Sequence, residues 1–273
     1  MVRWFNRHAT VCYAVVLLPL WVKLTQLFWQ DTIGIAGYYI PLLLACAAMV
    51  LLSGRCLARE TAQSVEQYRL RCDPEPMEAT CRELLACRRR WKRKNRFCLS
   101  LRLNLMTALC AKGDLAGALK LAADTEPLLQ KRGGVLRGMG ELNRASVELS
   151  LGHCAEAESR LRAAEEIIGA LPEKAEKSRA RESYLLAIHR CRLRLLRDGG
   201  SEALAEELTA LLEQAECLSE QVILHWHLAG CVRSMGREEL ARPHLEFVAD
   251  RGNRFAVRAQ ALALLEGLPW AKT

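Results

Sequence analysis

The 273-residue sequence lacks the short motifs that identify common catalytic and nucleotide-binding sites. It contains no HExxH zinc-hydrolase motif, no GxSxG nucleophile elbow, and neither the GxGxxG nor the GxxxxGK phosphate loop. After residue 54, almost no stretch alternates polar and apolar residues as a half-buried strand does. The sequence therefore predicts an all-α protein that is not an enzyme and holds neither cofactor nor metal. The catalytic alternative is an enzyme with a dispersed, unrecognised helical active site.

Paired cysteines are also missing, although the chain contains 12 cysteines. They are scattered singly with no CxxC pair, which argues against both a disulfide framework and a thiolate metal site. We expect reduced thiols that pack as small apolar residues. His225 and His227 flank Trp226, but a spacing of two places them on different faces of a helix, so they do not share a metal ion.

Charge is scarce in residues 1–54, which hold three basic and one acidic side chain. Two apolar runs of 21 residues occupy this region, at 9–29 and 33–53. At ~1.5 Å per residue, each is long enough to cross a hydrocarbon core of about 30 Å. The first run contains Lys23, whose stem is long enough to reach the interface. We therefore predict a transmembrane helical hairpin over residues 1–54, in contact with the lipid bilayer.

Basic residues flank this hairpin on one side of the membrane. Arg3 and Arg7 precede it, whereas Arg55 and Arg59 follow it. The positive-inside rule then predicts an integral membrane protein with both termini in the cytoplasm. The alternative is a cleaved signal peptide covering the first run; the second run would still leave the rest of the chain in the cytoplasm.

The remainder is rich in Ala, Leu, Glu and Arg, and a turn followed by an alanine recurs along it. The recurring glycines are Gly113, Gly152, Gly200 (preceded by Gly199) and Gly236, at intervals of 39, 48 and 36 residues. Each is followed within a few residues by an alanine: Ala118, Ala157, Ala205 and Ala241. This pattern predicts helical hairpins in series, with glycine at the left-handed residue that ends the first helix.

The last unit carries the clearest motif, with small and apolar residues at Leu228, Ala229, Val232, Gly236, Ala241, Leu245 and Val248. This arrangement resembles the tetratricopeptide repeat (TPR) family, whose units are antiparallel helix pairs of 34 residues. The resemblance covers about residues 97–250 and implies a TPR-like α-solenoid, in which each hairpin buries its stripe against the next. A generic α-solenoid is the alternative.

Three regions follow from these patterns. Residues 1–54 form the hairpin, residues 55–96 a helical linker with a basic run, and residues 97–273 the TPR-like repeats. The turn at Asp73-Pro74-Glu75-Pro76 breaks the helix that leaves the membrane. Arg254 to Leu265 is expected to be a terminal helix that caps the stack.

Arg190, Arg194 and Arg197 recur at i, i+4 and i+7, and therefore share a helix face. The TPR resemblance implies that this helix lines a concave groove, where basic residues bind an acidic peptide. Asn143 and Arg233 are expected to share the groove. The alternative is a solvent-exposed face paired with nearby glutamates.

The densest cluster of charge lies just before the predicted repeats. It consists of Arg88, Arg89, Arg90, Lys92, Arg93, Lys94 and Arg96, with Trp91 inside it. This run is suited to anionic lipid headgroups at the inner membrane face, at about 1 kcal/mol per basic residue. It fits nucleic acid less well. The alternative is a solvated loop that helps to set membrane topology.

A cluster of glycines at 133, 134, 138 and 140 does not match a phosphate loop, and we interpret it as a loop leading into the second hairpin. Taken together, the sequence predicts a membrane-anchored cytosolic adaptor that binds a protein partner in a helical groove.

Overall fold

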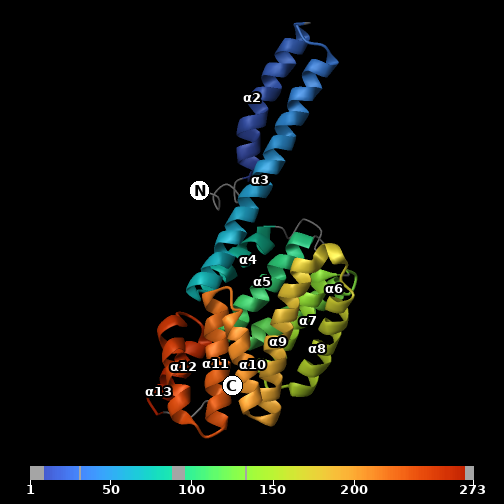
Figure 1. Cartoon of the computed structure of the whole chain (residues 1–273). Helices are drawn as coiled ribbons and strands as arrows, with labels where there is room; N and C mark the ends of the chain where they lie inside the picture. Colours follow the sequence, from blue (N-terminus) through green and yellow to red (C-terminus); the bar gives the residue numbers. More distant parts are fainter. Residues whose placement is uncertain (1–8, 31, 88–95, 133, 268–273) are drawn as a thin grey trace. The chain divides into compact units, whose positions relative to one another are not determined.

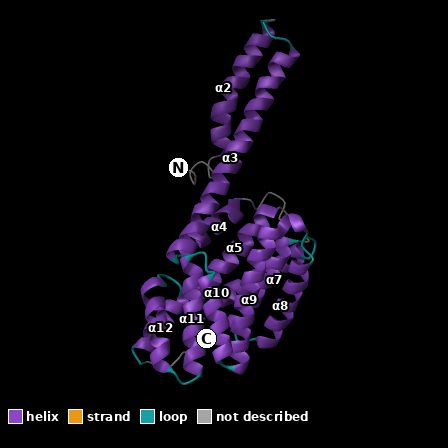
Figure 2. Cartoon of the chain, in the orientation of Figure 1, coloured by secondary structure: helices purple, strands orange, loops and turns teal. Residues whose placement is uncertain are grey.

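The computed structural model describes residues 9–30, 32–87, 96–132 and 134–267. Within these ranges the chain forms twelve α-helices and one short 3-10 helix, η2 (Glu173–Ala175), with no strand (Figure 2). The prediction of an all-α protein is therefore confirmed.

The chain divides into two compact units, residues 1–63 and residues 64–273. The first unit contains α2 (Ala9–Trp29) and most of α3 (Ile35–Arg71), the remainder of which belongs to the second unit. The two helices meet near the short connection between them (Figure 1): Tyr38 forms a hydrogen bond with Thr25 at 3.2 Å, and its ring lies 5.6 Å from that of Phe28. The helix over 9–29 is thus as predicted, whereas the second helix continues well beyond residue 53.

One helix among the described residues, α3, is long and apolar enough to cross a membrane. None of its most apolar 18-residue window is buried by other parts of the protein. Helix α2 has the length of a membrane span but is not identified as one by the same criterion. The structure therefore supports one candidate membrane span, whereas the sequence predicted two.

The second unit continues from the end of α3 through ten further helices (Figure 1). Their bounds are α4 (Glu75–Cys87), α5 (Arg96–Lys112), α6 (Leu115–Leu129), α7 (Val135–Ser150), α8 (Cys154–Gly169), α9 (Glu176–Asp198), α10 (Glu202–Glu213), α11 (Leu218–Ser234), α12 (Glu238–Arg251) and α13 (Ala256–Leu265). Helix α3 ends just before Asp73 and Pro74, as predicted. Because α4 packs against α5, part of the predicted linker is built into this unit.

Glycine ends four of these helices where the sequence predicted turns. Gly113, Gly152, Gly199 and Gly236 all have positive φ angles, between 75° and 84°. This left-handed conformation strains a residue that carries a Cβ atom, and glycine adopts it freely. The third turn uses Gly199 for this purpose, while Gly200 serves close packing instead.

Three clusters of the core each join three successive helices. One lies between α7, α8 and α9 and contains Leu142, Leu161 and Leu186. The next joins α9, α10 and α11, and a third joins α11, α12 and α13. Helices α5, α7, α9 and α11 also contact one another in that order. Burial of each apolar stripe therefore depends on the neighbouring helices.

The C-terminal helix does more than cover the last pair. Helix α13 forms as predicted, but it packs on α12, α11 and also α5. The ring of Phe255 lies 5.2 Å from that of Tyr68, and Asn253 donates a hydrogen bond of 2.7 Å to the carbonyl of Arg71. The first and last segments of this unit are therefore in contact, so the expectation of a simple end cap is incomplete.

The glycine cluster is not the loop that we expected. Gly138 and Gly140 lie inside α7, and only Gly134 precedes that helix among the described residues. A Cβ atom at Gly140 would come within 2.4 Å of Leu129, and one at Gly138 within 2.4 Å of Glu182. Here the missing side chains allow neighbouring helices to approach the backbone of α7.

Candidate functional site

The three predicted groove arginines lie on the outer face of α9, which we define as the side between α8 and α10. Arg190 pairs with Glu165 of α8, and Arg194 pairs with Glu207 of α10. Arg197 contacts Glu158 of α8 at 3.8 Å as well as its own neighbour, Asp198, at 2.9 Å. The arginines share a face as predicted, and each has a carboxylate partner. Their role in partner binding stays a prediction.

These pairs are largely solvent-exposed. The side chain of Arg194 is 42% exposed and that of Glu207 is 44% exposed. The hydrogen bond from Arg194 lowers the pKa of Glu207, and the bond to Glu207 raises the pKa of Arg194. Exposed pairs of this kind contribute little to stability and exchange partners readily.

The other two predicted partner-binding residues lie elsewhere. Arg233, at the end of α11, pairs with Glu238 of α12 at 2.8 Å. Asn143 of α7 donates a hydrogen bond of 3.1 Å to the carbonyl of Leu103 in α5. The structure therefore does not bring the five predicted groove residues into one site. Asn143 lies on the side of α7 that faces α5, away from the three arginines.

The predicted lipid-binding run falls almost entirely outside the described residues. Residues 88–95 are not described, which leaves Arg96 as its one described member. Arg96 is the first residue of α5 and is exposed. A role for Arg88, Arg89, Arg90, Lys92, Arg93 and Lys94 stays a prediction.

A different polar cluster lies on the inner face of α9, the side between α7 and α11. Arg192 is half-buried there and donates a hydrogen bond of 3.0 Å to the hydroxyl of Ser150 in α7. Among the described residues it has no carboxylate partner. His189 lies one turn before it, and His227 of α11, 5% exposed, is close enough to feel its charge. Four helices contribute to this region, because Cys110 of α5 also interacts electrostatically with Arg192.

Burial and positive charge act in the same direction on this cluster. Burial lowers the pKa of Arg192 to about 10. Burial and the charge of Arg192 lower the pKa of His189 to about 4 and that of His227 well below its ordinary value. Both imidazoles are therefore neutral at physiological pH. The Nδ1 atom of His189 is buried without a hydrogen-bond partner among the described residues.

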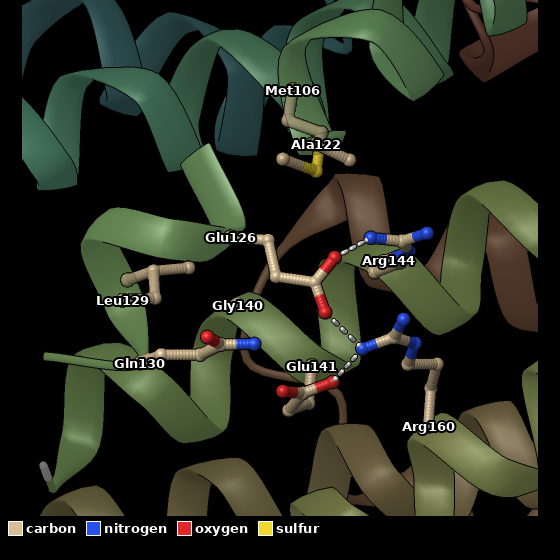
Figure 3. A pocket seen from close by; sticks show the side chains of 9 residues that line it. All are labelled: Met106, Ala122, Glu126, Leu129, Gln130, Gly140, Glu141, Arg144 and Arg160. Atoms are coloured by element: carbon tan, nitrogen blue, oxygen red, sulfur yellow. Dashed lines mark hydrogen bonds and ion pairs between the residues drawn. The ribbon is translucent and has the colours of Figure 1, made fainter. Parts of the chain in front are cut away.

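A small pocket lies between α6, α7 and α8 (Figure 3). It is lined by Met106, Ala122, Glu126, Leu129, Gln130, Gly140, Glu141, Arg144 and Arg160. Its interior has room for about one water molecule. Such a volume is too small for a cofactor or a peptide side chain.

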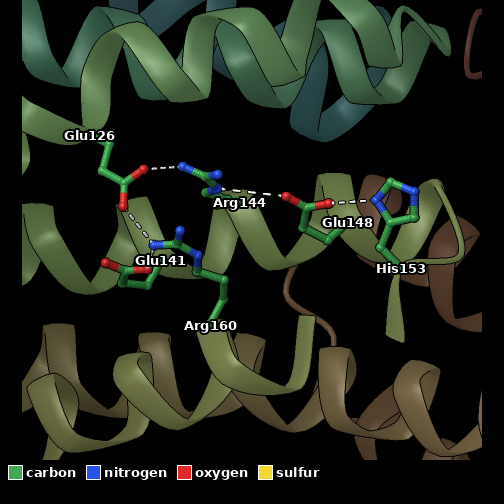
Figure 4. A network of polar contacts seen from close by, with 6 residues as sticks. All are labelled: Glu126, Glu141, Arg144, Glu148, His153 and Arg160. Carbon is green, nitrogen blue, oxygen red and sulfur yellow. Dashed lines mark hydrogen bonds and ion pairs between the residues drawn. The ribbon is translucent and has the colours of Figure 1, made fainter. Parts of the chain in front are cut away.

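The charged residues of that pocket belong to a network of ion pairs in which carboxylates and arginines alternate (Figure 4). Glu126 accepts hydrogen bonds from Arg144 and from Arg160, the latter at 2.8 Å, and Arg160 also reaches Glu141 at 3.2 Å. Burial alone would raise the pKa of Glu126, but the two arginines outweigh it and lower that pKa. The network continues through Glu148, 3.7 Å from Arg144, to His153. We interpret it as a structural tie between three helices.

Glu182 of α9 is a buried carboxyl group that the sequence did not reveal. It is 2% exposed, and neither side-chain oxygen has a hydrogen-bond partner among the described residues. Burial raises its pKa to about 7. The missing Cβ atom of Gly138 makes room for this side chain against α7.

A histidine pair joins α11 to α12. The Nδ1 atoms of His225 and His244 are 2.7 Å apart, and Phe247 stacks on His225. The sequence did not predict this pair, because the two residues are 19 positions apart and meet only through the packing of α11 against α12. Burial lowers the pKa of both rings, and the neighbouring ring lowers that of His225 further.

The cysteines and the possible metal ligands of the described ranges bear on the sequence predictions. The ten cysteines whose side chains are described are free, and six of them are buried. Those residues also contain no group of three or more histidine, cysteine or acidic side chains arranged to hold a metal ion. No protein-family model matches the sequence, and no curated protein or solved structure is significantly similar to this chain.

Proposed function

We propose that this chain is a membrane-anchored helical adaptor whose second unit binds a segment of a partner protein. The main support is the apolar surface of α3, where Leu43, Leu44 and Leu51 are each about two-thirds exposed. A continuous apolar surface of this size is stable against lipid and is unfavourable in water. An anchored helical protein without a recognised catalytic motif is best explained as a binding protein.

We further propose that α2 is a second span and that both termini lie in the cytoplasm. Helix α2 has 21 residues and exposes Val15, Leu18 and Val22. Its length suits a bilayer, and the flanking arginines favour this orientation.

Epitope accessibility tests this topology. An epitope inserted after Gln30 should be reached by antibody in intact cells, whereas epitopes at either terminus should require permeabilisation. Access to an N-terminal epitope from outside would instead indicate a single span and would exclude the proposed hairpin.

The proposed binding element is a TPR-like array. Its support is the serial packing of α5 to α12 and the glycine turns between the paired helices. Recognition would use preformed helical surfaces, and anchoring would raise the effective concentration of the partner at the membrane. The outer-face arginines suit an acidic segment that exchanges with their present carboxylate partners.

The test is a crosslinking pull-down from native membranes. The intact chain is compared with Arg190→Glu/Arg194→Glu/Arg197→Glu. We expect a partner captured by the intact chain to be lost in this variant. Glu165→Gln/Glu207→Gln serves as the matched control, because it frees Arg190 and Arg194 from their partners and should strengthen capture. An unchanged set of partners in both variants would exclude the outer-face arginines as the binding site.

The alternative is an electrostatic binder of anionic lipid or nucleic acid through residues 88–96. The density of basic residues in this run is its support. Replacing its seven basic residues by glutamine should then abolish binding, and binding by the intact chain should fall steeply with salt. Capture of a protein partner that is insensitive to these changes would favour the adaptor.

A further inference from the structure

The inner face of α9 carries a half-buried cation, Arg192, whose surroundings differ from those of the outer-face arginines. Arg190, Arg194 and Arg197 each have a carboxylate partner, whereas Arg192 has none among the described residues. We propose that Arg192, together with His189 and His227, binds a phosphate-type oxyanion. This proposal goes beyond the adaptor function and does not depend on it.

The guanidinium group has donors to spare. It carries five N–H groups in a planar fork, and one nitrogen, Nη2, donates to Ser150 at 3.0 Å. The Ser150 hydroxyl in turn donates to the carbonyl of Ser146 at 2.9 Å. Because a hydroxyl is uncharged, it does not balance the charge of the guanidinium group. Desolvating a cation without a counter-ion is unfavourable, and a bound anion would offset that penalty. The fork of an arginine matches the oxygens of phosphate in geometry as well as charge.

The two imidazoles add ring nitrogens from two helices, α9 and α11. A neutral imidazole has one N–H donor, and the Nδ1 atom of His189 is without a partner among the described residues. His227 belongs to α11, so the donors come from two different helices. A tetrahedral anion accepts hydrogen bonds in several directions, whereas a carboxylate accepts them mainly in one plane. The arrangement of three nitrogen-bearing side chains therefore favours phosphate.

Solvent reaches this face of the helix. Leu196 lies one turn beyond Arg192 on the same face of α9, and it is 48% exposed. Arg192 itself is only partly covered. Because Arg192 keeps part of its surface in solvent, an anion would approach the guanidinium group from there. No acidic side chain forms an ion pair or hydrogen bond with Arg192 within the described part of the chain, so no carboxylate there competes for it.

The experiment measures binding of inorganic phosphate to the full chain in neutral detergent, by ³¹P line broadening and by calorimetry. The intact protein is compared with Arg192→Met and with the control Arg242→Met, which removes an exposed arginine of α12 that pairs with Glu246. We expect Arg192→Met to weaken binding by about tenfold or more and Arg242→Met to leave it unchanged. Circular dichroism verifies that both variants are folded.

Two results would overturn the proposal: no binding by the intact chain, or equal binding by the intact chain and Arg192→Met. If Arg192→Met does not fold, Arg192→Lys replaces it, because lysine keeps the charge and loses the fork. Weaker binding of inorganic phosphate by this variant supports the site, and unchanged binding contradicts it.

A second arm identifies the source of the phosphate. Short-chain phosphatidic acid is titrated against the same three proteins. Tighter binding than that of inorganic phosphate, lost in Arg192→Met, assigns the site to a lipid headgroup. Equal or weaker binding assigns it to a free phosphate. Binding that Arg192→Met retains places the lipid elsewhere and leaves the inorganic phosphate result to decide the site.

Discussion

The two faces of α9 differ in how their positive charge is balanced. On the outer face, Arg190 and Arg194 meet carboxylates of α8 and α10 near the solvent. On the inner face, Arg192 meets a serine hydroxyl and two imidazoles, and solvation is reduced. The outer pairs contribute little energy, whereas a partly desolvated cation without a counter-ion lowers the stability of the fold. The comparison shows that two faces of one helix can balance positive charge with different groups, because they meet different neighbouring helices.

The largest effect is expected where α9 ends against α11. A Cβ atom at Gly200 would come within 2.0 Å of the carbonyl oxygen of Cys231, which is backbone and cannot swing aside. Gly200→Ala should therefore push the turn between α9 and α10 away from α11 and destabilise the chain by about 3 kcal/mol. Thermal unfolding in detergent, followed by circular dichroism, measures this change.

Gly152→Ala is the matched control for that substitution. Gly152 has a φ of 77° and no heavy atom near the position of a Cβ, so its replacement tests backbone strain alone. We expect a loss of about 1 kcal/mol. Equal losses in the two variants would show that the approach of α9 to α11 is not tight.

Glu182 is expected to make stability depend on pH. Its pKa is raised to about 7 in the folded chain from an ordinary value of 4.5. The folded state therefore favours the neutral acid, and this contribution is complete below about pH 4.5 and lost as the pH rises through about 7. We expect a loss of about 2 kcal/mol between pH 5 and pH 8 that is absent in Glu182→Gln. Parallel pH profiles for the two proteins, from denaturant unfolding in detergent, would contradict this assignment.

Removal of the inner cation should stabilise the chain in the absence of phosphate. Arg192→Met replaces a half-buried charge that has no carboxylate partner among the described residues by a shorter, apolar side chain. We expect a gain of about 1 to 2 kcal/mol in the free energy of unfolding. The same unfolding measurement in phosphate-free buffer tests it. A loss of stability would contradict this view and would show that the hydrogen bond to Ser150 and the packing of Arg192 outweigh its desolvation.

The smallest effect is expected on the outer face. Arg194→Gln removes an exposed pair with Glu207 and should change stability by less than about 0.5 kcal/mol, with little left at high salt. A loss of several kcal/mol in the same assay would show that the outer pairs hold α9 between α8 and α10. The contrast between the two faces would then disappear.

Much of the architecture could be predicted because its signals are local. Positive φ angles occur at Gly113, Gly152, Gly199 and Gly236, and the Asp73-Pro74 break follows the end of α3. Each depends on a few adjacent residues whose conformational preferences are strong. The prediction that Gly138 and Gly140 lie in a loop was wrong. These glycines are required by tertiary contacts, because Glu182 and Leu129 occupy the positions that their side chains would fill.

The polar contacts around α9 were less predictable than the architecture. Helical spacing placed Arg190, Arg194 and Arg197 on one face, but spacing alone does not say which helices that face meets. It also gave no reason to single out Arg192, two residues from Arg190 on another face. Glu182 and the His225–His244 pair escaped detection because burial and long-range contacts, which no local pattern encodes, produce their properties.

The helical class, the apolar N-terminal segment and the glycine turns follow from composition and from interactions between near neighbours in the chain. Which side chains face each other across helices depends on how the helices pack. This packing closed the first and last segments of the second unit through Tyr68 and Phe255, and it placed Arg192 where no carboxylate among the described residues balances it. The physical reason is that charge balance and desolvation depend on distance in space, which helical periodicity constrains only within a single helix.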